Sequence, residues 1–259
     1  DYYQICKNGY QACGDSFYSI KNQDRLVSVL ADGLGSGIKA SVLATLTTTM
    51  AAGFISSRMD IKRAAEVILE TLPVCSSRHI GYSTFTIIDA GFDGRLRIIE
   101  HDNPPYAFVR DGRIMPVIKQ EIPIKSFRKS HLYYSELELQ PEDRVLYYSD
   151  GVSQAGMGLP HLPLGWQEKR VEDYILGLVQ KNCRISAGQI SKDIAQKACE
   201  YDGYKAADDI TCAALYFRNP RRTIVFTGPP YKKEHDAVLA GIAREFSGKK
   251  VICGGTTAA

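Results

Sequence analysis

The sequence has 259 residues, which fits one large domain or a domain of about 200 residues with a small appendage. Hydrophobic residues make up 44% of the chain, enough to bury a sizeable core, and the 24% of charged residues is ordinary for a globular protein. The net charge is only +3 and the basic residues are scattered, which excludes the strong positive field of a nucleic-acid-binding protein.

Cysteine usage and hydropathy predict a cytoplasmic protein. The seven cysteines are odd in number and form no CxxC pair, which argues against a disulfide framework and against a zinc site. We therefore expect reduced cysteines. No apolar stretch approaches the ~20 residues that span a bilayer, and no signal peptide precedes the first strand, so no membrane segment is expected.

The N-terminal third predicts a hairpin followed by two helices. Residues 14–31 predict two strands around the polar turn KNQD. Apolar residues at helical spacing predict a helix over 36–58. Asp60 is the expected N-cap of a second helix, IKRAAEVILETL, which Pro73 follows.

The following region predicts strands and then grouped helices. Strands are predicted at 82–89, 95–102, 105–118, 131–139 and 144–149, and helices near 167–182 and 186–201 precede a strand at 210–217. The Gly- and Pro-rich segment 154–166 predicts a mobile flap beside the site. Antiparallel strands with grouped helices indicate an α+β fold with a strand-rich centre and helices outside.

The pattern changes after Asn219-Pro220, where a strand, a helix and another strand are predicted in turn. We therefore divide the chain into a domain of residues 1–218 and a β-α-β extension of residues 219–259. The extension is too small to fold well alone, and we interpret it as a truncated part of a further domain.

Four aspartates stand at the ends of predicted strands: Asp15 in GDSF, Asp32 in ADGLGSG, Asp150 in YSDGV and Asp208 in ADDIT. A single DG is usually a turn, but four such sites beside apolar strands are hard to explain as turns. Clustered carboxylates repel one another unless cations offset their charge, and oxygen ligands suit Mg²⁺ or Mn²⁺ rather than zinc. The glycines after Asp32 and Asp150 are expected to let the backbone approach an ion, with the Gly33 carbonyl as a further ligand.

The ordered set GDSF, ADGLGSG, SDG and DDIT resembles the metal-dependent protein phosphatase (PPM) superfamily, and within it the bacterial SpoIIE-like serine phosphatase branch. The intervening segments GYSTFTIID, DNPPYAFVRDG and EDRVLYYSDG also match. The resemblance covers about residues 13–217. It implies a central antiparallel β-sandwich flanked by helices on both faces.

The resemblance also implies a role for each carboxylate. Asp32 resembles the aspartate that bridges two metal ions, and the Gly33 carbonyl would bind one of them. Asp150 and Asp208 resemble ligands of the other ion. Asp15 resembles the early acidic residue that holds the second ion, directly or through water.

Asp209, Ser36 and two histidines carry further expectations. Asp209 stands where many family members have asparagine, so we expect it to support the ligands. Ser36 is expected to cap the helix whose N-terminal amides would favour an anion. Many members carry a histidine near the DG motif, and none stands there in this chain. For His79 and His101 a structural or surface role is the better interpretation.

The function implied is hydrolysis of phosphoserine or phosphothreonine on a regulatory protein, by a water that two divalent cations, Mn²⁺ or Mg²⁺, activate. Asp32 and Asp15 would be the catalytic residues, and by analogy the substrate would be a phosphorylated anti-sigma-factor antagonist. The alternative is a phosphoprotein-binding or scaffold module with a degenerate metal site. The oligomeric state stays open. The chain lacks the GxGxxG, P-loop and GxSxG motifs of nucleotide-binding enzymes and serine hydrolases.

Overall fold

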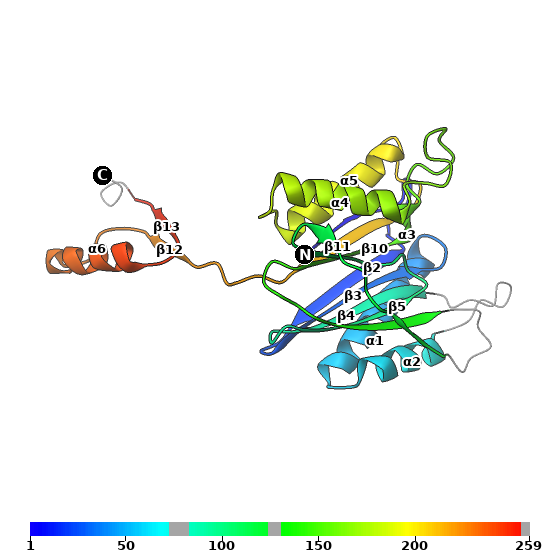
Figure 1. Cartoon of the computed structure of the whole chain (residues 1–259), viewed down its shortest axis with the longest axis horizontal. Helices are drawn as coiled ribbons and strands as arrows, with labels where there is room; N and C mark the ends of the chain where they lie inside the picture. The colour runs from blue at the N-terminus through cyan, green and yellow to red at the C-terminus, as the bar shows by residue number, and fades with distance from the viewer. Residues whose placement is uncertain (73–82, 124–130, 255–259) are drawn as a thin grey trace. The chain divides into compact units, whose positions relative to one another are not determined.

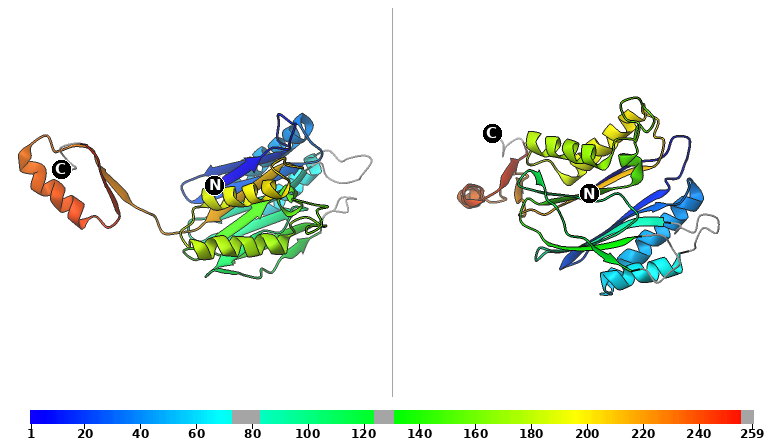
Figure 2. Two further views of the ribbon diagram at one scale, coloured as in Figure 1. Left: turned by 90° about the horizontal axis from the view of Figure 1, so that it is seen from above. Right: turned by 45° about the vertical axis from the view of Figure 1, so that its right-hand side comes forward.

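The computed structural model describes residues 1–72, 83–123 and 131–254. The chain divides into two compact units, Asp1–Phe217 and Arg218–Ala259. In the larger unit two antiparallel sheets pack face to face and helices cover the outer face of each sheet (Figures 1 and 2). The predicted α+β class and the sandwich with helices on both faces are therefore confirmed.

One sheet has six strands in the order β2-β3-β4-β5-β9-β8. Its strands are β2 (Asp15–Lys21), β3 (Arg25–Gly33), β4 (Ser83–Gly91), β5 (Arg95–His101), β8 (Gln120–Ile122) and β9 (Leu132–Glu138). The helices α1 (Ile38–Ser56) and α2 (Ile61–Thr71) cover its outer face (Figure 1). Along β3 the side chains alternate between layers, because Val29 packs under these helices and Leu30 packs toward the other sheet.

The predicted start of α2 is confirmed in atomic detail. The Asp60 side chain accepts hydrogen bonds from the backbone amides of Lys62 and Arg63. These bonds satisfy two of the amide groups that a helix leaves unpaired at its first turn.

The other sheet has five strands in the order β1-β11-β10-β6-β7. Its strands are β1 (Tyr2–Ile5), β6 (Ala107–Arg110), β7 (Arg113–Ile114), β10 (Arg144–Tyr148) and β11 (Ile210–Tyr216). The helices α4 (Glu168–Lys181) and α5 (Ala187–Tyr201) cover its outer face (Figure 1). The apolar run of β10 is buried along its whole length because both of its faces meet a packed layer. The hydroxyls of Tyr147 and Ser28 join the two sheets by a hydrogen bond of 2.5 Å.

Several short elements of the structure were not predicted. These are β1, β8 and the one-turn helix α3 (Asp150–Ser153). Residues 154–166 do form a surface loop, but Ala155, Leu162 and Trp166 are buried in the core beneath α4 and α5. Apolar anchors therefore hold part of this segment down, although Gln154 at its start hydrogen-bonds to Asp150. The mobile flap stays a prediction.

Two of the cysteines contradict the prediction of a fully reduced chain. Cys6 and Cys13 form a disulfide across the loop between β1 and β2. Their spacing matches no recognised pattern, and an odd total of cysteines does not exclude a single pair. Cys212 is a free, fully buried thiol, as its apolar surroundings predicted.

Helix α1 corrects the expectation about apolar stretches. It has 19 residues and a mean hydropathy of 1.4, so among the described residues it meets the length and composition criteria for crossing a membrane. This is weak evidence, because the core helix of a globular domain meets the same criteria. Ala44, Ala51 and Ile55 of α1 are buried against the six-stranded sheet.

The smaller unit contains the predicted β-α-β arrangement. Strands β12 (Thr223–Phe226) and β13 (Lys249–Ile252) pair in parallel. The 3₁₀ turn η1 (Lys233–His235) and helix α6 (Asp236–Glu245) connect them. None of the α6 side chains is buried, which fits a unit too small to enclose a core.

Candidate metal centre

The four predicted aspartates come from two sheets to one end of the sandwich. Asp15 opens β2 and pairs directly with Asp32 near the end of β3. Asp150 follows β10 and Asp208 precedes β11, and these two strands are neighbours in the other sheet. Because antiparallel neighbours run in opposite directions, the end of one strand lies beside the start of the next.

A cavity of about 450 Å³ opens at this end. Its lining contains Asp32, Gly33, Ser36, Asp150 and Asp208 from the predicted set, together with Lys7, Leu34, Gly35, Ser83, Thr84, His101 and Asp102. Asp15 is only 4% exposed and is in electrostatic contact with Asp32. The structure therefore brings together carboxylates that lie far apart in the sequence.

The carboxylates raise one another's pKa values. Burial, and then the charges of Asp15, Asp150 and Asp208, raise the pKa of Asp32 to about 9. Burial also raises the pKa of Asp15 to about 8, although hydrogen bonds from Thr211 and Ser149 oppose this shift. The pKa of Asp150 is raised by burial and by the charge of Asp208. With no cation bound, the cluster therefore keeps protons that a metal ion would displace.

One oxygen atom of the cluster is particular evidence that a cation binds here. Oδ2 of Asp15 accepts a hydrogen bond of 2.6 Å from the Thr211 hydroxyl. Oδ1 of Asp15 is buried and has no hydrogen-bond partner among the described residues. An unpaired buried carboxylate oxygen is costly, and coordination of a cation would satisfy it. The set of donors consists of oxygens, which fits Mg²⁺ or Mn²⁺.

The comparisons with known proteins identify the family. The family model "Stage II sporulation protein E (SpoIIE)" matches residues 22–218. The chain belongs to the SpoIIE family. This confirms the resemblance to the metal-dependent protein phosphatase superfamily, whose members include protein serine/threonine phosphatases of the PP2C type.

Solved structures show the same fold at low sequence identity. The PP2C phosphatase domain of Bacillus subtilis SpoIIE, with a fragment of its regulatory domain, is 18% identical with a TM-score of 0.65, covering 83% of this chain and 62% of that one. A Mycobacterium tuberculosis structure of RsbU and RsbW domains is 19% identical with a TM-score of 0.66, covering 94% of this chain and 67% of that one. RsbX in complex with magnesium is 18% identical with a TM-score of 0.57, covering 83% and 92%. No curated protein matches the chain by sequence.

Asp209 of this SpoIIE-family domain uses both carboxylate oxygens for backbone amides. Oδ1 accepts a hydrogen bond from the Lys7 amide at 2.9 Å, and Oδ2 accepts one from the Gly14 amide at 2.8 Å. Asp209 therefore ties the Cys6–Cys13 loop to the start of β11, next to Asp208. This arrangement supports the predicted role of Asp209 as a residue that positions the ligands.

Other polar side chains, which were not predicted, bond to the candidate ligands. Gln154 donates to Oδ2 of Asp150 at 2.9 Å. Gln4 donates to the Thr211 hydroxyl, which in turn donates to Asp15. Thr211 belongs to the DDIT motif, so its position was a signal that could have been used. Gln4 and Gln154 carry no comparable signal.

The two glycines of the SpoIIE-family DG motifs serve packing rather than turning. Neither Gly33 nor Gly151 has a positive φ. A Cβ atom at Gly33 would lie 2.1 Å from the Ala40 carbonyl oxygen, and one at Gly151 would lie 2.1 Å from the Asp209 carbonyl oxygen. These glycines were expected to let the backbone approach an ion, and the close approach in the structure is to other backbone segments. Close contact between backbone segments requires glycine there.

Ser36 and His101 both line the cavity. The expected cap at Ser36 is wrong, because the N-cap of α1 is Gly37 (φ 73°) and no side chain caps it. Ser36 lines the cavity instead. His101 is 1% exposed, its ring lies 5.0 Å from that of Phe85, and it borders the cavity. Its burial is consistent with the predicted structural role. His79 lies outside the described residues.

Lys7 is a basic cavity residue that the sequence did not predict. Its ammonium group lies 3.5 Å from Oδ1 of Asp208. It stands before the first family motif, inside a loop that no periodic pattern marks. The structure thus adds one positive charge to a cavity that was expected to hold only carboxylates.

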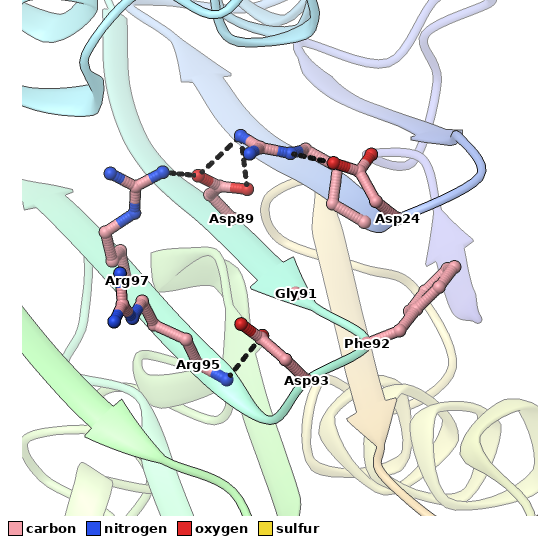
Figure 3. A pocket seen from close by; sticks show the side chains of 8 residues that line it. Asp24, Asp89, Gly91, Phe92, Asp93, Arg95 and Arg97 are labelled. Atoms are coloured by element: carbon pink, nitrogen blue, oxygen red, sulfur yellow. Dashed lines mark hydrogen bonds and ion pairs between the residues drawn. The ribbon is translucent and has the colours of Figure 1, made fainter.

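A second cavity, of about 490 Å³, lies at the opposite end of β3 and β4 (Figure 3). Buried Asp89 lies there between Arg25 and Arg97 and forms an ion pair with each. Asp93 accepts a hydrogen bond from the Arg95 amide. The aspartates and arginines of this cavity balance one another, so we interpret it as a structural ion-pair network.

Proposed function

We propose that the protein hydrolyses phosphoserine or phosphothreonine of another protein with two divalent cations, Mn²⁺ or Mg²⁺. The observation that carries the proposal is the convergence of Asp15, Asp32, Asp150 and Asp208 on one end of a SpoIIE-family sandwich. The raised pKa values and the unpaired Asp15 oxygen support the same conclusion. All four carboxylates are present, so an inactive binding or scaffold module is the weaker alternative.

The four aspartates and the Gly33 carbonyl would each bind one or both of the cations. Asp32 is the carboxylate in electrostatic contact with the other three, so we assign it the bridging position. Asp15 and the Gly33 carbonyl would complete the ligands on the side of β2 and β3. Asp150 and Asp208 would provide those on the other sheet. When bound, the cations supply a water of lowered pKa as nucleophile and neutralise charge on the phosphoryl oxygens.

The remaining cavity residues orient the substrate. The Lys7 ammonium gives a positive charge beside Asp208 that would attract a phosphoryl oxygen. Ser36 and Thr84 line the same cavity and offer hydroxyl groups. Asp209 keeps Lys7 in place through its backbone amide. Asp32 and Asp15 are therefore the catalytic residues of the proposal, while Asp209 positions them and Lys7.

A regulatory phosphoprotein is the substrate that fits best. The structures similar to this chain include an RsbU domain and a protein of the bacterial stressosome. We therefore propose a phosphorylated anti-sigma-factor antagonist as the substrate, acted on in the cytoplasm. We also propose that residues 219–259 belong to a further domain, since the family model ends at residue 218.

The test is phosphate release from a phosphoserine peptide and from p-nitrophenyl phosphate, with Mn²⁺ and then with excess EDTA. We expect turnover of both substrates with Mn²⁺ and loss of both activities with EDTA. A phosphotyrosine peptide of the same sequence is the control for selectivity. Binding of the phosphoserine peptide without turnover, at any Mn²⁺ concentration, would establish the scaffold alternative instead.

A further inference from the structure

Helix α1 carries a row of exposed apolar side chains on the face that turns away from the sheet. Ile38, Val42 and Leu46 are 76%, 59% and 44% exposed. Their spacing of four residues places them on one side of the helix, over a length of about 12 Å. We call these three residues the α1 ridge.

The ridge is unusual for the outer face of a surface helix. Such a face normally carries charged and polar residues. The other exposed residues of α1 are Lys39, Thr45, Thr49 and Gly53, so a single charge stands on the whole outer face. The opposite face is already buried against the six-stranded sheet. The same exposed apolar residues explain the high hydropathy of α1.

The ridge is continuous with the rim of the metal cavity. Ser36, two residues before Ile38, lines the cavity. The ring of Tyr10, a residue 47% exposed, lies 3.2 Å from where a Cβ atom of Gly37 would stand. The ammonium of Lys7, inside the cavity, lies 6.0 Å from the centre of the same ring. A surface therefore runs from Lys7 over Tyr10 to Ile38.

We propose that the α1 ridge is the docking surface for the phosphoprotein substrate. The proposal rests on the function proposed above, and it names the surface that selects a protein over a small phosphate ester. A phosphoserine that reaches the cavity brings its neighbouring residues over the rim. Apolar side chains of the substrate then pack on Val42 and Leu46, and Tyr10 contacts the residues next to the phosphoserine. Burial of apolar area remote from the reacting phosphate strengthens binding of the protein substrate alone.

The test uses the double variant Val42→Gln/Leu46→Gln in the full chain. Glutamine keeps helix propensity and removes the apolar surface. The matched control is Val238→Gln/Ile242→Gln, a pair with the same spacing on α6 that is 58% and 48% exposed. The substrates are phosphorylated casein and p-nitrophenyl phosphate, both with Mn²⁺. We expect kcat/KM for casein to fall about tenfold in the α1 variant, mainly through KM, as for loss of an interface anchor.

Hydrolysis of p-nitrophenyl phosphate should stay within about twofold of the unmodified protein in both variants, and the α6 variant should also keep its activity on casein. Equal kcat/KM for casein in the α1 variant and the unmodified chain would overturn the docking surface while leaving the phosphatase function intact. If the unmodified chain hydrolyses neither casein phosphate nor p-nitrophenyl phosphate, the proposed function itself is overturned. A changed oligomeric state, or lost binding to phospholipid vesicles, with casein turnover unaltered would assign the ridge to a second copy or to a membrane.

Discussion

Asp15 and Asp32 lie directly opposite each other across the β2–β3 ladder, so the hairpin alone brings two carboxylates of the candidate metal centre together. The register of the hairpin is set at its other end. There the Asn22 amide donates to the Arg25 carbonyl at 2.9 Å and closes the turn. A slip of one residue would move one of the two side chains to the other face of the sheet. The metal centre therefore depends on a turn at the far end of the strands.

We predict that the stability of the metal-free protein falls as the pH rises. Asp15 and Asp32 keep their protons up to a pH of about 8 and about 9 in the folded state, whereas in the unfolded chain both ionise near 3.8. Between these values the folded state binds more protons than the unfolded chain, so the free energy of unfolding decreases as the pH rises.

Urea unfolding in EDTA, from about pH 5 to about pH 8, measures this decrease. The variant Asp15→Asn/Asp32→Asn is the control, because it removes both titrating groups. Its free energy of unfolding should depend less on pH than that of the unmodified chain. The same pH dependence in both proteins would show that these carboxyl groups ionise normally.

Cation binding should reverse the destabilisation. A ligand that binds the folded state and not the unfolded state raises the free energy of unfolding, by about 2.7 kcal/mol at a concentration one hundred times its Kd. We therefore expect Mn²⁺ to raise Tm and EDTA to lower it. The rise should be larger at high pH, where fewer protons compete for the carboxylates. The absence of any shift with millimolar Mn²⁺ would count against the site.

The Cys6–Cys13 disulfide should stabilise the metal centre. It closes the loop that carries Lys7 and that hydrogen-bonds to Asp209. Removing a disulfide that closes such a short loop costs roughly 2–3 kcal/mol of stability, because the unfolded chain gains conformational entropy. We expect the variant Cys6→Ser/Cys13→Ser to unfold at lower urea concentrations and to need more Mn²⁺ for half-maximal activity. Cys183→Ser, at an exposed free thiol, is the control. A result equal to this control would mean that hydrogen bonds alone hold the loop.

Alanine substitutions at two glycines near α1 should change the free energy of unfolding in opposite directions. Gly33→Ala places a methyl group 2.1 Å from the Ala40 carbonyl oxygen, so the helix or the strand must shift. Gly53→Ala is the matched control, because no atom lies within 4 Å of its Cβ position on the exposed side of α1. We expect Gly53→Ala to raise the free energy of unfolding by about 0.5–1 kcal/mol. Gly33→Ala should lower it by several times that amount, of order 2–3 kcal/mol, as for overpacking of a core. Equal effects would contradict the close contact at Gly33.

The layers of the fold and the residues of the candidate site could be predicted because their signals are local in the sequence. Local signals, such as the KNQD turn, the Asp60 cap and the apolar run of β10, each concern neighbouring residues. What could not be predicted depends on how the backbone is arranged in three dimensions. The position of Lys7 beside Asp208 arises only when segments from both ends of the domain meet. The Cys6–Cys13 pair and the need for glycine beside Ala40 concern residues close in sequence, but they depend on the path of irregular loops that no periodic pattern specifies.

The last prediction concerns Asp32→Asn, with Asp24→Asn as its control. An amide has the shape of the carboxyl group and keeps one oxygen, so the fold should survive. The free energy of unfolding of the metal-free protein should also depend less on pH, because the carboxyl group whose pKa is raised by burial and by three neighbouring carboxylates is gone. What is lost is the negative charge proposed to hold two cations together. We expect the rate of p-nitrophenyl phosphate hydrolysis to fall roughly a thousandfold or more, which corresponds to a loss of several kcal/mol of transition-state stabilisation.

Asp24 lies at the opposite end of the same strand system, half exposed, where it pairs with Arg58 at 2.9 Å. Such an exposed pair contributes about 0–1 kcal/mol, so Asp24→Asn should keep its activity and its response to Mn²⁺. The Mn²⁺-induced rise in Tm should shrink in Asp32→Asn alone, which separates loss of the cations from loss of the fold. If Asp32→Asn instead keeps near-normal Mn²⁺-dependent turnover, then Asp32 does not bridge the cations and the assignment of the whole centre is wrong.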